Sequence, residues 1–176
     1  MAHSLPALYK FLVTSAAGII AAVAVLFFTG CDRLDDERIP VEPVNIVFQT
    51  VADWNIYGAN SALTWNMFIR SERKPANFFY TAQTYTGYGG VLLVCDVLGN
   101  PQAFDLSCPV ERSKDVRIFI NEDNEYLAEC PKCHSTYNVF SLLGHPVSGE
   151  AASKGYALRR YRVGTGRAGE YMVVSF

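Results

Sequence analysis

Two short cysteine-containing stretches constrain this chain more than any other feature. The first is Cys108-Pro-Val-Glu111, and the second, 22 positions later, is Cys130-Pro-Lys-Cys133-His134. A Cys-x-x-Cys pair on a tight turn places both sulfur atoms on one side, which is typical of half a zinc or iron–sulfur site. Cys108 would supply a third ligand from the other loop. The spacing therefore predicts two loops that converge on one metal.

The part of the chain after residue 45 is predicted to be all-β. Its apolar runs are short and are separated by Gly, Asn and Pro, and no stretch shows a helical period of useful length. The last two runs, 156–163 and 170–174, alternate as antiparallel strands with one buried face do. The glycine-rich residues 87–90 precede a strand-like run, so they predict a hairpin turn. We expect a small antiparallel barrel or sandwich with metal-binding hairpin loops over residues 46–176.

The N-terminal residues have the pattern of a secretory signal. Lys10 is the only charged residue before Asp32, and residues 11–28 form an apolar run. The run ends in Phe28-Thr29-Gly30-Cys31, which resembles a bacterial lipobox and implies cleavage before Cys31 and acylation of its thiol. The alternative is an uncleaved membrane anchor, because 18 apolar residues can just span a bilayer. We predict a lipoprotein signal peptide over 1–30 and an acidic linker over 31–45.

Both interpretations place the domain in the cell envelope, on the periplasmic or surface side of a membrane. Under the lipoprotein interpretation, a lipid on Cys31 tethers the domain to that membrane. The net charge is −2 and no basic cluster stands out, so nothing in the chain predicts nucleic-acid binding. No Ser/His/Asp arrangement or carboxylate pair has visible catalytic spacing. The sequence therefore gives no indication of an enzyme.

Three segments resemble parts of the Rieske iron–sulfur domain. AFDLSCP (103–109) is similar to the strand that enters the family's first loop, and CPKCHSTYNVF (130–140) to its second loop and exit strand. GHPVSGEAASKGYALRRYRV (144–163) is similar to its third loop and final strand. The resemblance spans roughly residues 89–163. It implies a Rieske-like β fold, a [2Fe–2S] cluster and electron transfer with a redox or protein partner of unspecified identity.

The ligand positions depart from the family pattern. The family's boxes are Cys-x-His and Cys-x-x-His, and their cysteine positions match Cys108 and Cys130. The two histidine positions are occupied by Val110, which offers no ligand atom, and by Cys133. His134 follows directly. We therefore expect an altered ligand set in place of an ordinary Rieske cluster.

Three alternatives remain for the cysteines. In one, Cys108, Cys130 and Cys133 bind zinc or an atypical cluster together with His134 or Glu111. In another, the metal is absent and a Rieske-like fold brings Cys108 and Cys130 together as a disulfide. In the third, the Cys-x-x-Cys pair is a redox-active dithiol.

Two further residues carry smaller expectations. His145 lies in the third loop, from which it could reach the site or face solvent. Cys95 lies within a predicted strand, where a free cysteine usually packs as a small hydrophobic residue.

Overall fold

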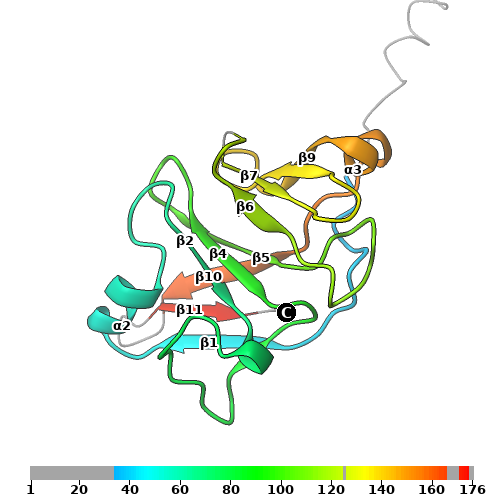
Figure 1. Ribbon diagram of the computed structural model, residues 1–176. Coiled ribbons are helices and arrows are strands. Elements are labelled where there is room, and N and C mark those ends of the chain that lie inside the picture. The colour runs from blue at the N-terminus through cyan, green and yellow to red at the C-terminus, as the bar shows by residue number, and fades with distance from the viewer. Residues whose placement is uncertain (1–33, 125, 166–170, 175–176) are drawn as a thin grey trace, which may run out of the picture. The chain divides into compact units, whose positions relative to one another are not determined.

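The computed structural model describes residues 34–124, 126–165 and 171–174 (Figure 1). The predicted signal peptide, 1–30, and the predicted lipid site, Cys31, lie outside these residues. Among the described residues, no helix is long and apolar enough to cross a bilayer.

The described strands form two antiparallel sheets, which confirms the all-β prediction. The larger sheet has seven strands in the order β2-β4-β5-β10-β11-β1-β3, and the smaller has four in the order β6-β7-β8-β9. Within the described part of the chain the seven-stranded order is linear, so the architecture is sandwich-like and not a closed barrel. The larger sheet comprises β1 (Val44–Phe48), β2 (Trp65–Phe68), β3 (Tyr85–Thr86), β4 (Val91–Cys95), β5 (Pro101–Asp105), β10 (Arg160–Thr165) and β11 (Tyr171–Val174). The smaller comprises β6 (Phe119–Asn121), β7 (Leu127–Glu129), β8 (Thr136–Asn138) and β9 (His145–Ser148).

Three short helical segments, which the sequence analysis did not expect, interrupt the strands. They are α2 (Val51–Tyr57), the 3-10 turn η1 (Arg70–Glu72) and α3 (Gly149–Lys154). Helix α2 begins with a capping box, in which Thr50 Oγ1 accepts from Asp53 N at 3.0 Å and Asp53 Oδ2 accepts from Thr50 N at 3.1 Å. Each helix is too short to show a period in the sequence.

Part of the expected third loop is also regular structure. Residues 145–148 form β9, which pairs with β8, and α3 follows directly. The sequence analysis placed His145 in a loop and did not anticipate this strand. The pairing with β8, which a sequence pattern of four residues does not reveal, gives the segment its backbone hydrogen bonds.

The buried residues form two clusters. The first, which we call the aromatic core, consists mainly of residues of the larger sheet and includes Cys95 of β4, so the expected burial of that cysteine is confirmed. Its members are Val44, Ile46, Phe48, Trp54, Ala59, Phe68, Val91, Leu93, Cys95, Ala103, Tyr161 and Val173. The second, the cysteine core, contains buried residues from both sheets: Ile69, Leu92, Val94, Phe104, Leu106, Cys108, Ile118, Ile120, Ala128, Cys130, Tyr137, Val139, Phe140, Ala151 and Leu158.

A buried carboxylate fixes the point at which the chain leaves β5. Asp105 accepts from the backbone of Ser107 at 2.7 Å and Tyr88 at 3.1 Å, and from the Tyr161 hydroxyl at 2.6 Å. These bonds tie the predicted glycine-rich turn, 87–90, to the residue before Cys108. A Cβ at Gly89 would lie 2.0 Å from Ser107 Oγ, so only glycine fits this close approach.

The predicted acidic linker is partly visible as residues 34–43, which precede β1. This part lies against the domain, and Ile39 is only 1% exposed. The Arg159 side chain, 120 positions away, donates to the Ile39 carbonyl at 2.8 Å. The described part of the linker is thus held by tertiary contacts.

Candidate metal centre

Two loops carry the three cysteines, and backbone hydrogen bonds shape each loop. Cys108 follows β5, where its N–H donates to Val116 O at 3.1 Å and its carbonyl accepts from Arg112 N at 2.9 Å. Cys130 follows β7, and its carbonyl accepts from His134 N at 3.0 Å, which closes a tight turn over Cys133. The local sequence thus forms the turn that the Cys-x-x-Cys spacing predicts.

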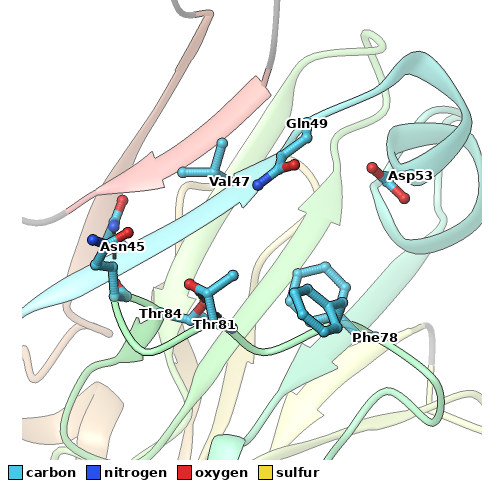
Figure 2. A pocket seen from close by; sticks show the side chains of 9 residues that line it. Asn45, Val47, Gln49, Asp53, Phe78, Thr81 and Thr84 are labelled. Atoms are coloured by element: carbon cyan, nitrogen blue, oxygen red, sulfur yellow. Dashed lines mark hydrogen bonds between the residues drawn. The ribbon is translucent and has the colours of Figure 1, made fainter.

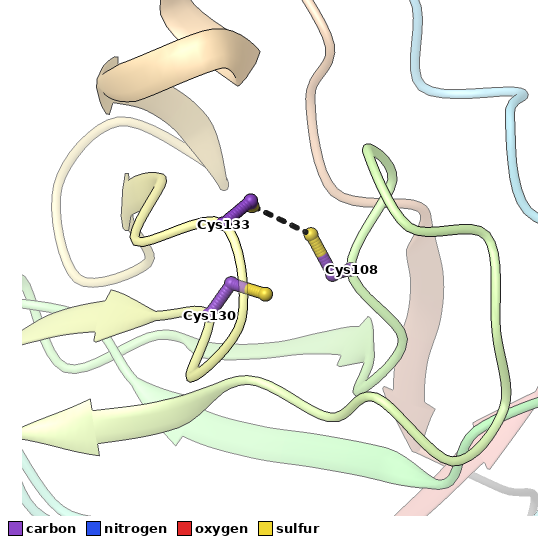
Figure 3. A group of neighbouring side chains, drawn as sticks. All are labelled: Cys108, Cys130 and Cys133. Carbon is purple, nitrogen blue, oxygen red and sulfur yellow. Dashed lines mark hydrogen bonds between the residues drawn. The ribbon is translucent and has the colours of Figure 1, made fainter.

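The loops bring the three sulfur atoms together (Figure 3). The Sγ atoms of Cys108, Cys130 and Cys133 all lie within 4.8 Å of one another. Cys108 and Cys130 are fully buried, whereas Cys133 is partly exposed. The predicted convergence of the two loops is therefore confirmed.

The spacing of the sulfur atoms matches a shared metal better than a bond between them. Cys108 Sγ and Cys133 Sγ are 3.6 Å apart, and the cysteines are free thiols. A disulfide bond is about 2.05 Å long. Thiolates at about 2.3 Å from one tetrahedral ion stand roughly 3.8 Å apart. The distance between Cys108 Sγ and Cys133 Sγ is close to this tetrahedral edge.

Two hydroxyl groups lie beside the sulfur atoms, and the sequence analysis did not identify either. Tyr137 Oη is 3.5 Å from Cys108 Sγ, and Ser135 Oγ is 3.3 Å from Cys133 Sγ. Their place directly after the Cys-x-x-Cys turn, within four residues of Cys133, was the available indication. Cys133 Sγ donates to Ser135 Oγ, and in the Cys108–Tyr137 pair either atom can donate.

The local environment shifts the pKa values of the three thiols in different directions. Burial raises the pKa of Cys108 to about 12, and burial also raises the pKa of Cys130. At Cys133 burial acts in the same direction, but hydrogen bonds with Ser135, Cys130 and Cys108 together outweigh it and lower the pKa below the ordinary value. A metal that binds all three must displace protons, since the thiolate is the ligand.

The other predicted ligands do not join the three cysteines. The side chain of His134 is 74% exposed, and its Nδ1 lies 3.3 Å from Glu129 Oε1. Glu111 forms an ion pair with Lys132. His145 lies in β9 opposite Asn138. Among the described residues, the group of metal-ligating side chains contains only the three cysteines.

The turn geometry explains the position of His134. Its backbone φ is 54°, a left-handed conformation in which a residue reverses the chain direction. His134 therefore serves the turn and pairs with Glu129, while Val110 packs against the cysteine core. The expectation that His134 or Glu111 completes the ligand set has no geometric support in the described residues.

A pocket of about 180 Å³ lies elsewhere, between β1 and residues 78–84 (Figure 2). Phe78 and Thr81 face the side chains of β1 across it. No cysteine lines this pocket, so it is separate from the metal centre. Its lining consists of Asn45, Val47, Gln49, Asp53, Phe78, Phe79, Thr81, Gln83 and Thr84.

No known protein family, curated protein or solved structure matches this chain. The Rieske resemblance therefore rests on the three quoted segments alone.

Proposed function

We propose that this chain is a thiolate metal-binding domain of the cell envelope, in which Cys108, Cys130 and Cys133 hold one zinc ion. The observation that carries the proposal is the convergence of three free thiols, two of them fully buried, within 4.8 Å of one another. Thiolates select soft or borderline metals such as zinc and Cu(I).

Zinc suits a site with three protein ligands because it readily keeps a fourth position for water or another small ligand. Cys133 is the partly exposed member of the three, so we place the fourth position on its side. Three thiolates and a divalent ion carry a net charge of −1. Lys132, in the same turn, carries a positive charge and forms an ion pair with Glu111 of the other cysteine loop.

The [2Fe–2S] cluster that the resemblance implies fits this ligand set less well. Such a cluster takes four protein ligands. The described residues bring three thiols together, Val110 offers no ligand atom, and His134 pairs with Glu129. Because the set is one ligand short, electron transfer through a cluster is not part of the proposal.

The envelope location rests on the sequence pattern of residues 10–31. A lipid on Cys31 would attach the domain to a membrane and keep it outside the cytoplasm. Free thiols in that oxidising compartment are protected when a metal holds them.

A disulfide between Cys108 and Cys133 is the second candidate state of this site, because these two free thiols are neighbours, with their Sγ atoms 3.6 Å apart. This pair differs from the Cys108–Cys130 pair that the Rieske resemblance implied. In the reaction, the two thiols lose two electrons and two protons to a disulfide oxidant, which leaves as two thiols. The sulfur atoms must approach by about 1.5 Å to reach bonding distance.

The test is metal analysis of the full chain isolated from the membrane fraction, together with the variants Cys108→Ala, Cys130→Ala and Cys133→Ala. We expect one zinc per chain, lost in each variant but retained in Cys95→Ala. Two irons per chain, with inorganic sulfide and visible absorption, would show that the site holds an iron–sulfur cluster and not zinc. Absence of metal, with Cys108 and Cys133 recovered as one disulfide-linked peptide, would establish the second candidate instead.

A further inference from the structure

The segment before β1 is bound to the chain that follows α3. Asp35 N donates to Gly155 O at 2.8 Å, and Asp35 O accepts from Ala157 N at 2.9 Å. The two bonds form an isolated parallel bridge between Asp35 and Tyr156. Residues 34–39, which we call the clamp segment, are thereby held in a fixed register beside α3.

Arg38 extends from the clamp segment to the first cysteine loop. Its Nε donates to the carbonyl of Pro109 at 3.0 Å, one residue after Cys108. Its guanidinium carbon lies 3.6 Å from the centre of the Tyr156 ring, the stacking arrangement of a cation–π contact. The side chain is 22% exposed. One arginine thus connects the loop of Cys108 to Tyr156.

The second cysteine loop is connected to the same tyrosine through α3. Tyr156 N donates to Ala151 O at 2.9 Å, and Ala151 N donates to Ser135 Oγ at 3.1 Å. Ser135 Oγ lies 3.3 Å from Cys133 Sγ. Tyr156 also packs against the cysteine core. Contacts therefore lead from the clamp segment to both loops that carry the thiols.

We propose that the clamp segment holds the two cysteine loops closed, and that Arg38 is the positioning residue that fixes Cys108 through the Pro109 carbonyl. The segment begins three positions after Cys31, so whatever moves the chain at its N-terminal side acts on the thiol site. The claim about metal retention rests on the proposed function, whereas the claim about loop closure stands without it.

The experiment measures how fast each thiol reacts in the full chain after reduction and treatment with a chelator. Iodoacetamide is added, and modification of each cysteine is followed by peptide mass spectrometry. Cys108 is fully buried, so it reacts only when its loop opens. In Arg38→Ala we expect Cys108 to react roughly 10 to 100 times faster, because the variant loses one charged hydrogen bond and one cation–π contact.

Two controls make the result specific. Arg160→Ala removes an exposed arginine of β10 and should leave the Cys108 rate unchanged. Cys95, buried in the aromatic core, reports opening of that core and should react at the wild-type rate in Arg38→Ala. Arg38→Lys keeps the charge but loses the planar guanidinium, so its Cys108 rate should fall between those of wild type and Arg38→Ala. This variant also serves if Arg38→Ala does not fold.

The possible outcomes distinguish failure of the clamp proposal from failure of the proposed metal site. An unchanged Cys108 rate in the folded Arg38 variants overturns the clamp, and so does an equal rise at Cys95, which indicates that the opening is not confined to the cysteine loops. If wild type binds zinc, Arg38→Ala should also release it to a chelator faster, and an equal release rate would contradict the claim about metal retention. If wild type binds no metal and Cys108 still reacts faster, the proposed function fails and the clamp stands.

Discussion

The aromatic core and the cysteine core both consist of buried residues but are held together differently. In the aromatic core, rings contact one another repeatedly, such as Phe48 with Phe68 at 5.7 Å and Trp54 stacked on Tyr171 at 4.0 Å. In the cysteine core, two loops place three thiols within 4.8 Å of one another. The comparison teaches that burial alone does not define a site. Cys95 and Cys130 are both buried, yet only Cys130 has other thiols beside it.

The largest expected effect is in the aromatic core. Phe68 is fully buried and its ring contacts Phe48 and Phe78. Phe68→Ala should lower the free energy of unfolding by about 3–5 kcal/mol, because it removes apolar burial and leaves a cavity. Urea denaturation measures this loss. The control is Phe79→Ala, at an 81% exposed position, which should change stability by about 0.5 kcal/mol at most. Similar losses in both variants would contradict the assignment of this core.

A pair of cysteine variants compares the two cores directly. With zinc present at about 100 times its dissociation constant, Cys130→Ala should lose roughly 2.7 kcal/mol of metal-linked stability, in addition to the small effect of truncation. Cys95→Ala should lose about 1 kcal/mol, and that loss should be the same with and without zinc. Denaturation in zinc and in chelator measures both. A zinc-dependent loss in Cys95→Ala would show that the two cores are not independent.

A third prediction compares one buried tyrosine from each core. Tyr161→Phe removes a 2.6 Å hydrogen bond to the buried Asp105 carboxylate and should cost about 1.5–3 kcal/mol at neutral pH. Tyr137→Phe removes only a 3.5 Å contact with the Cys108 thiol and should cost about 1 kcal/mol. Equilibrium unfolding of both variants checks the order. A larger loss in Tyr137→Phe would reverse the comparison.

Tyr161 also predicts a pH dependence. Burial and the charge of Asp105 raise the pKa of Tyr161 above its value in the unfolded chain, which is about 10. Its contribution to stability is therefore complete below pH ~10 and is lost as the pH rises further. Unfolding measured between pH 8 and 11.5 should show this fall, reduced in Tyr161→Phe. If stability falls as steeply in that variant as in wild type, the pH dependence is due to other titrating groups.

The smallest expected effect on stability is at His134, which the sequence analysis named as a candidate metal ligand. His134 is largely exposed and pairs with Glu129, so His134→Ala should change stability by about 0.5 kcal/mol at most. Its metal content should equal that of wild type. Loss of the metal in this variant would place His134 in the ligand set with the three cysteines.

Short-range patterns were sufficient for several features of this chain. Apolar runs broken by Gly, Asn and Pro indicated the antiparallel strands, and the burial of Cys95 followed from its place in such a run. The Cys-x-x-Cys spacing indicated the turn over Cys133 and, with Cys108, a shared site. Each of these rests on neighbours in the sequence or on a simple period, which the amino-acid order contains directly.

Contacts between distant residues decided the rest. Glu129 and the backbone of the turn direct His134 away from the thiols, and Arg38 reaches Pro109 across 71 positions. The sequence by itself determined the β class and the cysteine turn, because local geometry and periodicity fix them. Only the tertiary structure decided which side chains surround the sulfur atoms, because that depends on how loops pack after the chain has folded.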